Sequence, residues 1–243
     1  MNTFMASSNK NGKLNTSEGG YAGHLAKIRI PDYTKGEELF NALSHGIGAI
    51  LGVLGLLLLL GKASAAAPGL RSLETVCAWI YGISMIMLYS MSCIYHALPK
   101  SSGLKRLFRV LDHCNVFLLV FGTYIPGVLI AVGGKLGWFL FSLVAFITAV
   151  GIILTLIDMD RFSKATVACH LINGWSIVFG IPRLFRAMGS AGVLYIALGG
   201  VVYSIGAALY GIGKKKRYLH SVFHVFCMAA TLLQFLGLYF YLF

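Results

Sequence analysis

The sequence has few charged residues: only 12% of its 243 residues are Asp, Glu, Lys or Arg, whereas 58% are hydrophobic. Little of the chain lies outside long apolar runs, which leaves almost no room for a water-soluble domain. No run alternates apolar and polar residues as the strands of a membrane β-barrel do, so the backbone groups must be satisfied within helices. These absences exclude a soluble globular protein and predict an all-α polytopic membrane protein.

Apolar windows of about 20 residues are long enough to cross the roughly 30 Å hydrocarbon layer of a membrane. The sequence has seven of them, at approximately 42–61, 75–97, 110–132, 136–157, 165–185, 190–212 and 220–242. We therefore expect a seven-transmembrane helix bundle over residues 36–243. Residues 1–35 are rich in Asn, Ser, Gly and Lys, which predicts a flexible polar tail. The tail has no early apolar core, so we expect no cleavable signal peptide.

Cysteine and proline are scarce, with five residues of each. All five cysteines fall within the apolar windows and none has CxxC spacing, so we expect them to pack as small apolar residues and not to form disulfides. Pro126 and Pro182 lie inside windows and should bend their helices. Gly48 and Gly52 form a GxxxG motif that permits close helix contact. Packing within the monomer is favoured over a dimer interface, and a homo-oligomer is left open.

Acidic residues are also scarce: 8 Asp and Glu stand against 20 Lys and Arg, giving a net charge of +12. No aromatic–basic platform accompanies this charge, so we expect no nucleic-acid partner. With the N-terminus inside, the outer loops hold only Lys62, Arg71, Lys135, Arg183 and Arg186, and the other fifteen basic residues lie inside. This asymmetry predicts a cytoplasmic N-terminus, an exterior C-terminus and a multi-pass protein of the inner (plasma) membrane. The basic residues would then contact anionic membrane lipids.

Ionisable and polar side chains gather at the window ends that share the cytoplasmic face. These ends carry Glu38, Asn41, His45, His96, Asp112, His113, His170, His220 and His224. Only His24, in the polar tail, stands apart from the other histidines. Among the acidic residues, only Asp112 is expected to start a span in a buried position. Because an ionisable residue inside a membrane is costly, such a layer marks a functional site by default.

His220 and His224 are four residues apart, which puts both imidazoles on one helix face. Zinc binds imidazole well, and a catalytic zinc site commonly has three protein ligands and one open position. We therefore predict that His96, His220 and His224 bind Zn²⁺. Asp112 would hold or deprotonate a water molecule at the site. Ser92, one turn from His96, could hydrogen-bond that water, Asp112 or a developing oxyanion.

Other interpretations of these residues stay open. A histidine in a membrane protein is often a hydrogen-bonded packing residue instead of a ligand. Asp112 could form a salt bridge with Arg109, one turn earlier on the same helix. His113 points about 100° away from Asp112 and is treated as an outer or interface group. His45 and His170 are expected to be structural or to lie outside the set of ligands.

At these residues the chain resembles the bacterial hemolysin III branch of the progestin and adipoQ receptor family, from about Glu37 to the C-terminus. The matching motifs are Glu38-x2-Asn41-x3-His45, Ser92-x3-His96, Asp112-His113, Thr123-Tyr124-x-Pro126, Gly174-Trp175 and His220-x3-His224. Phe223 departs from the Trp expected in many bacterial relatives, which affects only neighbouring packing. The resemblance implies seven helices with a cytoplasmic N-terminus, and a zinc site near the cytoplasmic side that Ser92, His96, Asp112, His220 and His224 match. It also implies ceramidase-like chemistry, haemolysis and membrane lipid homeostasis.

Three functions follow as hypotheses. The first is a zinc-dependent hydrolase of lipid amides or esters. The second is a non-enzymatic haemolysin, pore-forming protein or membrane-state regulator in which zinc is structural. The third is a proton- or metal-coupled transporter. A pore or transporter needs a polar path across the bilayer. The outer halves of the windows have few polar residues, which argues against both a monomeric channel and a transporter.

Overall fold

The computed structural model describes residues 23, 25, 27–213 and 216–243. Its regular elements are α2 (Lys35–Ala65), α3 (Pro68–Ala97), α4 (Gly103–Pro126), η1 (Gly127–Val132), α5 (Gly134–Asp158), α6 (Ser163–Trp175), η2 (Ser176–Gly180), α7 (Ile181–Gly213) and α8 (Leu219–Tyr241). Over the described residues the chain is helical and contains no strand. The predicted all-α class is confirmed. His24 lies outside the described residues.

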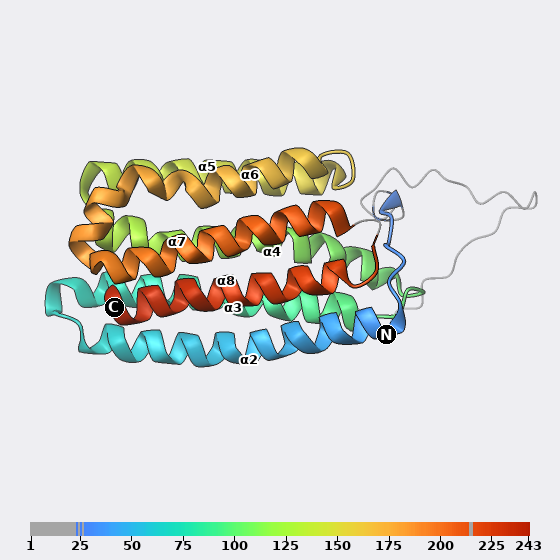
Figure 1. Cartoon of the computed structure of the whole chain (residues 1–243), viewed down its shortest axis with the longest axis horizontal. Helices are drawn as coiled ribbons and strands as arrows, with labels where there is room; N and C mark the ends of the chain where they lie inside the picture. Colours follow the sequence, from blue (N-terminus) through green and yellow to red (C-terminus); the bar gives the residue numbers. More distant parts are fainter. Residues whose placement is uncertain (1–22, 24, 26, 214–215) are drawn as a thin grey trace, which may run out of the picture.

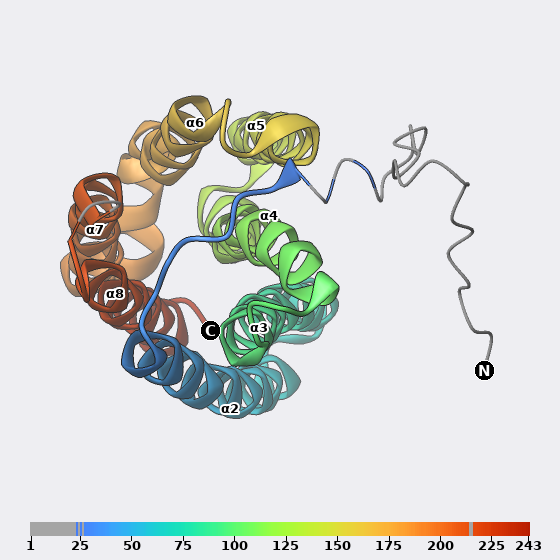
Figure 2. The same cartoon turned by 90° about the vertical axis from the view of Figure 1, so that its right-hand side faces the viewer.

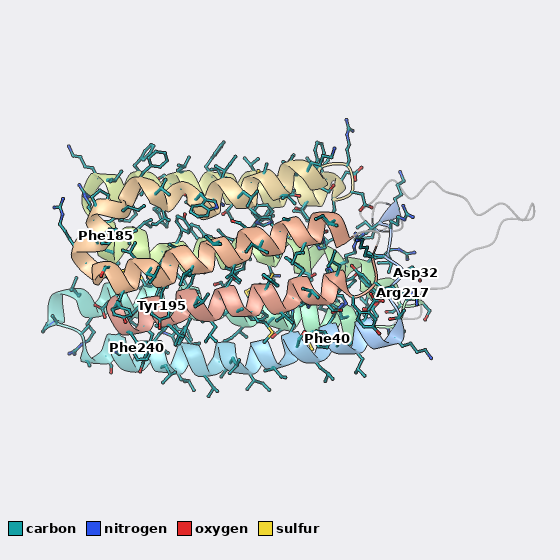
Figure 3. The ribbon with its side chains drawn as sticks, in the orientation of Figure 1. Asp32, Phe40, Phe185, Tyr195, Arg217 and Phe240 are labelled. Carbon is teal, nitrogen blue, oxygen red and sulfur yellow. The ribbon has the colours of Figure 1, made fainter. Side chains whose placement is uncertain are left out.

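The helices form a ring in which each packs on the next in chain order, and α8 closes the ring by packing on α2 (Figure 2). Viewed from the side, the start of α2 and the end of α8 lie at opposite ends of the bundle (Figure 1). Many large apolar side chains point outward, among them Phe40, Phe185 and Phe240 (Figure 3). A helical bundle with an apolar exterior is suited to contact with lipid.

Within the part of the chain that the structure describes, six helical stretches are long and apolar enough to cross a membrane. One of them, Ser163–Ile212, has 50 residues and contains two of the seven apolar windows. Its backbone leaves the helical conformation at Gly189, with φ 66° and ψ −178°. The chain turns back near this point (Figure 1), so the two windows form antiparallel arms. Glycine alone adopts this backbone conformation without steric strain.

Both prolines inside the windows lie next to a change of helix type. Pro126 ends α4, and the chain continues as the π-helical turn η1. Pro182 is the second residue of α7, directly after the 3₁₀ turn η2. Because proline removes one backbone donor, the neighbouring carbonyls must find other partners, and irregular turns of this kind result.

The glycines of the GxxxG motif pack inside the monomer. A Cβ at Gly48 would lie 2.7 Å from the ring of Tyr89, and one at Gly52 would lie 3.3 Å from Ile86. Their missing side chains therefore let α2 approach α3 closely. The five cysteines are all free, as expected.

Candidate metal centre

Three buried histidines come together at one end of the ring, here called the histidine end. His96 lies in the last turn of α3, and His220 and His224 lie in the first two turns of α8. One ring nitrogen of each lies within 4.8 Å of the others. Nε2 of His220 and Nε2 of His224 are 3.0 Å apart. The structure thus brings together the three predicted ligands from helices that are more than 100 residues apart in the chain.

Glu38 of α2 orients the His96 ring. His96 Nδ1 lies 2.6 Å from Glu38 Oε2, and Lys105 Nζ lies 3.0 Å from the other carboxylate oxygen. Lys105 also donates to the main-chain carbonyls of Tyr95 and Leu98, which end α3. With Nδ1 engaged, Nε2 of His96 is buried and has no hydrogen-bond partner among the described residues. A carboxylate behind a histidine is the usual outer support of a metal ligand.

The donor set fits a metal ion such as zinc. Three neutral imidazoles are good zinc ligands, and a buried ring nitrogen without a partner is costly unless something binds it. His96 Nε2 is such an atom, and the close approach of His220 and His224 leaves two further ring nitrogens facing one another. The cluster can therefore hold a metal ion, with Glu38 fixing the tautomer of one ligand.

His45 lies against the cluster without joining it. Its ring stacks on that of His224 with centroids 3.8 Å apart, and it meets the Tyr89 ring edge-on at 5.0 Å. Asn41, one turn earlier on α2, is fully buried and has no partner for either amide atom among the described residues. His45 thus packs against the cluster from outside the three grouped histidines, as predicted.

Asp112 and Ser92 lie side by side next to the cluster. Both are buried, and the Asp112 carboxylate interacts electrostatically with His96 and with the Ser92 hydroxyl. The Ser92 hydroxyl nevertheless makes no hydrogen bond of ordinary length within the described part of the chain. A carboxylate and a hydroxyl beside three imidazoles are the groups that were predicted to activate water and to stabilise an oxyanion.

The alternative partner of Asp112 is engaged elsewhere. Arg109 Nη2 lies 3.5 Å from Asp160, and its Nη1 donates to the carbonyl of Arg29. His113 is not one of the three grouped histidines: its Nδ1 donates to the carbonyl of Arg109 and lies 3.8 Å from Asp112 Oδ2, and its Nε2 lies 3.3 Å from the Tyr210 hydroxyl.

His170 stacks on Phe117 with centroids 3.6 Å apart. It is not one of the three grouped ligands, which agrees with a structural or outer role.

Two features were not predicted from the sequence. Tyr33, at the end of the expected polar tail, stacks on His220 with centroids 4.9 Å apart and planes 16° apart. At the other end of the bundle Glu74 is buried, with one carboxylate oxygen unpartnered among the described residues. Glu37 is buried as well. Asp112 is therefore one of three buried acidic side chains in α2, α3 and α4. The capping-box spacing of Thr34 and Glu37 could have located the start of α2 and hence Tyr33.

Comparison with known proteins agrees with this architecture. The profile of a family described as "Haemolysin-III related" matches residues 33–235. The "Hemolysin-3" protein of Bacillus cereus is 35% identical over 215 residues, covering 88% of this chain and 94% of that protein. A "Hemolysin-3 homolog" of Bacillus subtilis (strain 168) is 31% identical over 209 residues, covering 86% of this chain and 96% of that protein. The "Adiponectin receptor protein" of Drosophila melanogaster is 25% identical over 228 residues, covering 83% of this chain and 50% of the receptor.

Proposed function

This chain is an integral membrane protein of the haemolysin-III-related family, and we propose that it is a zinc-dependent hydrolase of membrane lipid amides or esters that acts in lipid homeostasis. The observation that carries the proposal is the convergence of three buried imidazole nitrogens within 4.8 Å. They lie beside Asp112 and Ser92 in a bundle whose exterior is apolar. A water-poor site that holds both a metal and a carboxylate suits hydrolysis of a substrate that arrives through lipid.

His96, His220 and His224 would hold the zinc ion, with Glu38 behind His96. A bound zinc ion polarises a carbonyl and lowers the pKa of a water molecule towards 7. Asp112 takes the proton from the attacking water and later gives it to the leaving amine or alcohol, so that the carboxylate is regenerated. Ser92 donates a hydrogen bond to the oxyanion that forms at the scissile carbonyl. Its hydroxyl lies beside Asp112 and makes no hydrogen bond of ordinary length among the described residues, so it can turn towards the oxyanion.

The proposal includes an orientation in the membrane. We infer seven crossings, because Gly189 divides the stretch of 50 residues and the chain turns back there. The histidine end faces the cytoplasm. In support, Lys100, Arg106 and Arg217 lie at this end, with Arg217 labelled there in Figure 3. The other end has fewer basic residues, as the positive-inside rule requires of an outer face.

The test is to measure zinc content and lipid turnover on the same purified preparations in lipid nanodiscs. His220→Ala is expected to lose zinc and all turnover, whereas Asp112→Asn should keep most of the zinc and lose turnover by about 10² or more. His45→Ala is the matched control, since its ring stacks on a ligand but is not one of the three, and it should retain zinc. Full turnover of a lipid amide by metal-free protein would refute the proposal.

A second candidate is a lytic protein in which zinc is structural, favoured by the names of the two Bacillus relatives. In that case His220→Ala would lose zinc and stability, while Asp112→Asn would leave lytic activity unchanged. This candidate would be favoured if Asp112→Asn released dye from liposomes as well as the unmodified protein does, and if neither protein turned over lipid.

A further inference from the structure

The residues before α2 cross the histidine end of the bundle as an extended strap, defined here as residues 28–34. Figure 2 shows this segment running from the start of α2 across the mouth of the ring. Lys27 and Ile28 line a small cavity with residues 157–160 at the end of α5. The strap therefore spans the ring from α2 to α5, on the side where His96, His220 and His224 lie.

Tyr33 covers the histidine cluster from this side. Its ring stacks on His220 and has its centroid 5.8 Å from that of His96. Beneath it, His96, His220 and His224 are only 2%, 8% and 1% exposed. A metal ion that enters from water at this end must therefore displace Tyr33.

Side chains, and not main-chain pairing, hold the strap in place. Among the described residues no main-chain hydrogen bond joins residues 28–33 to a helix of the ring. Arg106 Nε donates to the Ile28 carbonyl at 3.3 Å, and Arg109 donates to that of Arg29. Asp32 pairs with Lys100, and the Asp32 side chain is 100% exposed. A segment with so few buried contacts can open locally at small cost.

One end of the strap is firmly anchored. Thr34 and Glu37 form a capping box in which the Thr34 main-chain N–H and hydroxyl each donate to Glu37 Oε2 at 2.8 Å. The other carboxylate oxygen of Glu37 accepts from the Tyr218 N–H at 2.6 Å, which ties the start of α2 to the start of α8. Opening of the strap would therefore pivot at Thr34.

We propose that residues 28–34 are a lid over the metal site, hinged at Thr34, closed by the Tyr33 ring and latched by the Asp32–Lys100 ion pair. The lid controls how fast a metal ion and water exchange between the cluster and the aqueous phase. This proposal rests on the proposed metal site. A lid lies on the path of both entry and exit, so weakening it speeds both while leaving the equilibrium affinity nearly unchanged. A group that merely supports a ligand would change the affinity.

The first test measures zinc uptake and zinc release separately, by mixing the full-length protein with Zn²⁺ alone or with a coloured chelator. Asp32→Asn is expected to raise both rates by about two- to fivefold, the amount that a solvent-exposed ion pair supplies. The charge swap Asp32→Lys with Lys100→Asp is the matched control and should restore the slow rates. High salt should speed exchange in the unmodified protein and have little effect on Asp32→Asn.

The second test removes the cover itself. Tyr33→Ala should raise both rates by up to about tenfold, because the stacked ring is lost, whereas Tyr33→Phe should exchange zinc at the original rates. Unchanged rates in both Asp32→Asn and Tyr33→Ala would overturn the lid. So would faster release with unchanged uptake, because that pattern marks a residue that stabilises the bound metal.

A metal-free readout separates failure of the lid from failure of the proposed function. In protein without metal, modification of His220 by diethyl pyrocarbonate, followed on its peptide by mass spectrometry, should be faster in Tyr33→Ala and Asp32→Asn than in the unmodified protein. If zinc does not bind but His220 becomes more reactive in both variants, the lid stands and the proposed hydrolase fails. If zinc binds but His220 reacts equally fast in all three, the lid fails and the metal site stands.

Discussion

At the scale of single residues, the arrangement of the histidines depends on the side chains packed behind them. Glu38 fixes the tautomer of His96 by accepting from Nδ1, which leaves the buried Nε2 without a partner among the described residues. Lys105, 1% exposed, binds the second oxygen of the same carboxylate and two carbonyls at the end of α3. This arrangement joins α2, α3 and α4 at the point where the first ligand is placed.

Glu38→Gln should therefore weaken zinc binding by about 10- to 100-fold, the usual cost of losing an outer-layer partner of a metal ligand. The amide keeps the shape of the side chain but lacks the negative charge that stabilises the His96 N–H. Competition with a chelator of known affinity measures the effect. Glu74→Gln, at the opposite end of the bundle, is the matched control and should bind zinc as tightly as the unmodified protein. Equal affinity in both variants would contradict a supporting role for Glu38.

The three histidines that the structure groups could be predicted from the sequence, but the side chains that support them could not. His220 and His224 are four residues apart, so helical periodicity alone puts them on one face. His96 followed from its position at a window end. The pairing of Glu38 with His96 joins residues 58 positions apart and depends on the packing register of α2 against α3. Sequence spacing does not fix that register, and for the same reason the stacking of Tyr33 on His220 was not foreseen.

At the scale of helices, Gly189 separates the two arms of the stretch that runs from Ser163 to Ile212. At about 1.5 Å per residue a straight helix of 50 residues would be more than twice as long as the hydrocarbon layer of the membrane is thick. A Cβ at Gly189 would meet no atom within 4 Å, so the need for glycine here comes from the backbone conformation and not from crowding.

Gly189→Ala should destabilise the protein by about 1–3 kcal/mol, because an L-residue is strained at this φ and ψ. Gly174→Ala is the matched control: it also meets no atom within 4 Å but lies inside α6. That substitution should be neutral or stabilise by up to about 1 kcal/mol, since alanine is the better helix residue. Thermal unfolding in the same detergent measures both. A Gly189→Ala protein that is as stable as Gly174→Ala would contradict this account of the turn.

Hydropathy predicted the helices well, because apolar length alone determines whether a segment can cross a bilayer. The seven windows lie within the helical stretches that the structure forms. Helix type was less predictable: Pro126 and Pro182 indicated bends, but not that one would be followed by a π-helical turn and the other preceded by a 3₁₀ turn. The type of each turn depends on which neighbouring groups donate to the carbonyls that the prolines leave without a partner.

At the scale of the whole molecule, the closed ring explains how one end can hold a polar site in a protein with an apolar exterior. The contact of α8 with α2 brings His224 against His45 and the Tyr218 N–H against Glu37. These two contacts have nearly the same offset in sequence, so α2 and α8 run side by side in parallel. Polar side chains at the starts of both helices therefore lie at one level, and Lys100, Arg106 and Arg217 lie at the same end.

Orientation gives a prediction that distinguishes seven crossings from six. With seven, the exposed residues Arg186 and Lys216 lie on opposite sides of the membrane, and the C-terminus lies outside. In intact cells a membrane-impermeant thiol reagent should then label Arg186→Cys but not Lys216→Cys, which should react only after permeabilisation. The free native cysteines are buried or half-buried, and the unmodified protein provides the background. An antibody against a C-terminal tag should bind without permeabilisation. Labelling of Lys216→Cys in intact cells, with Arg186→Cys reactive only after permeabilisation, would reverse the orientation. An Arg186→Cys that stays unreactive after permeabilisation, together with an inaccessible C-terminal tag, would show that the chain does not cross on both sides of Gly189.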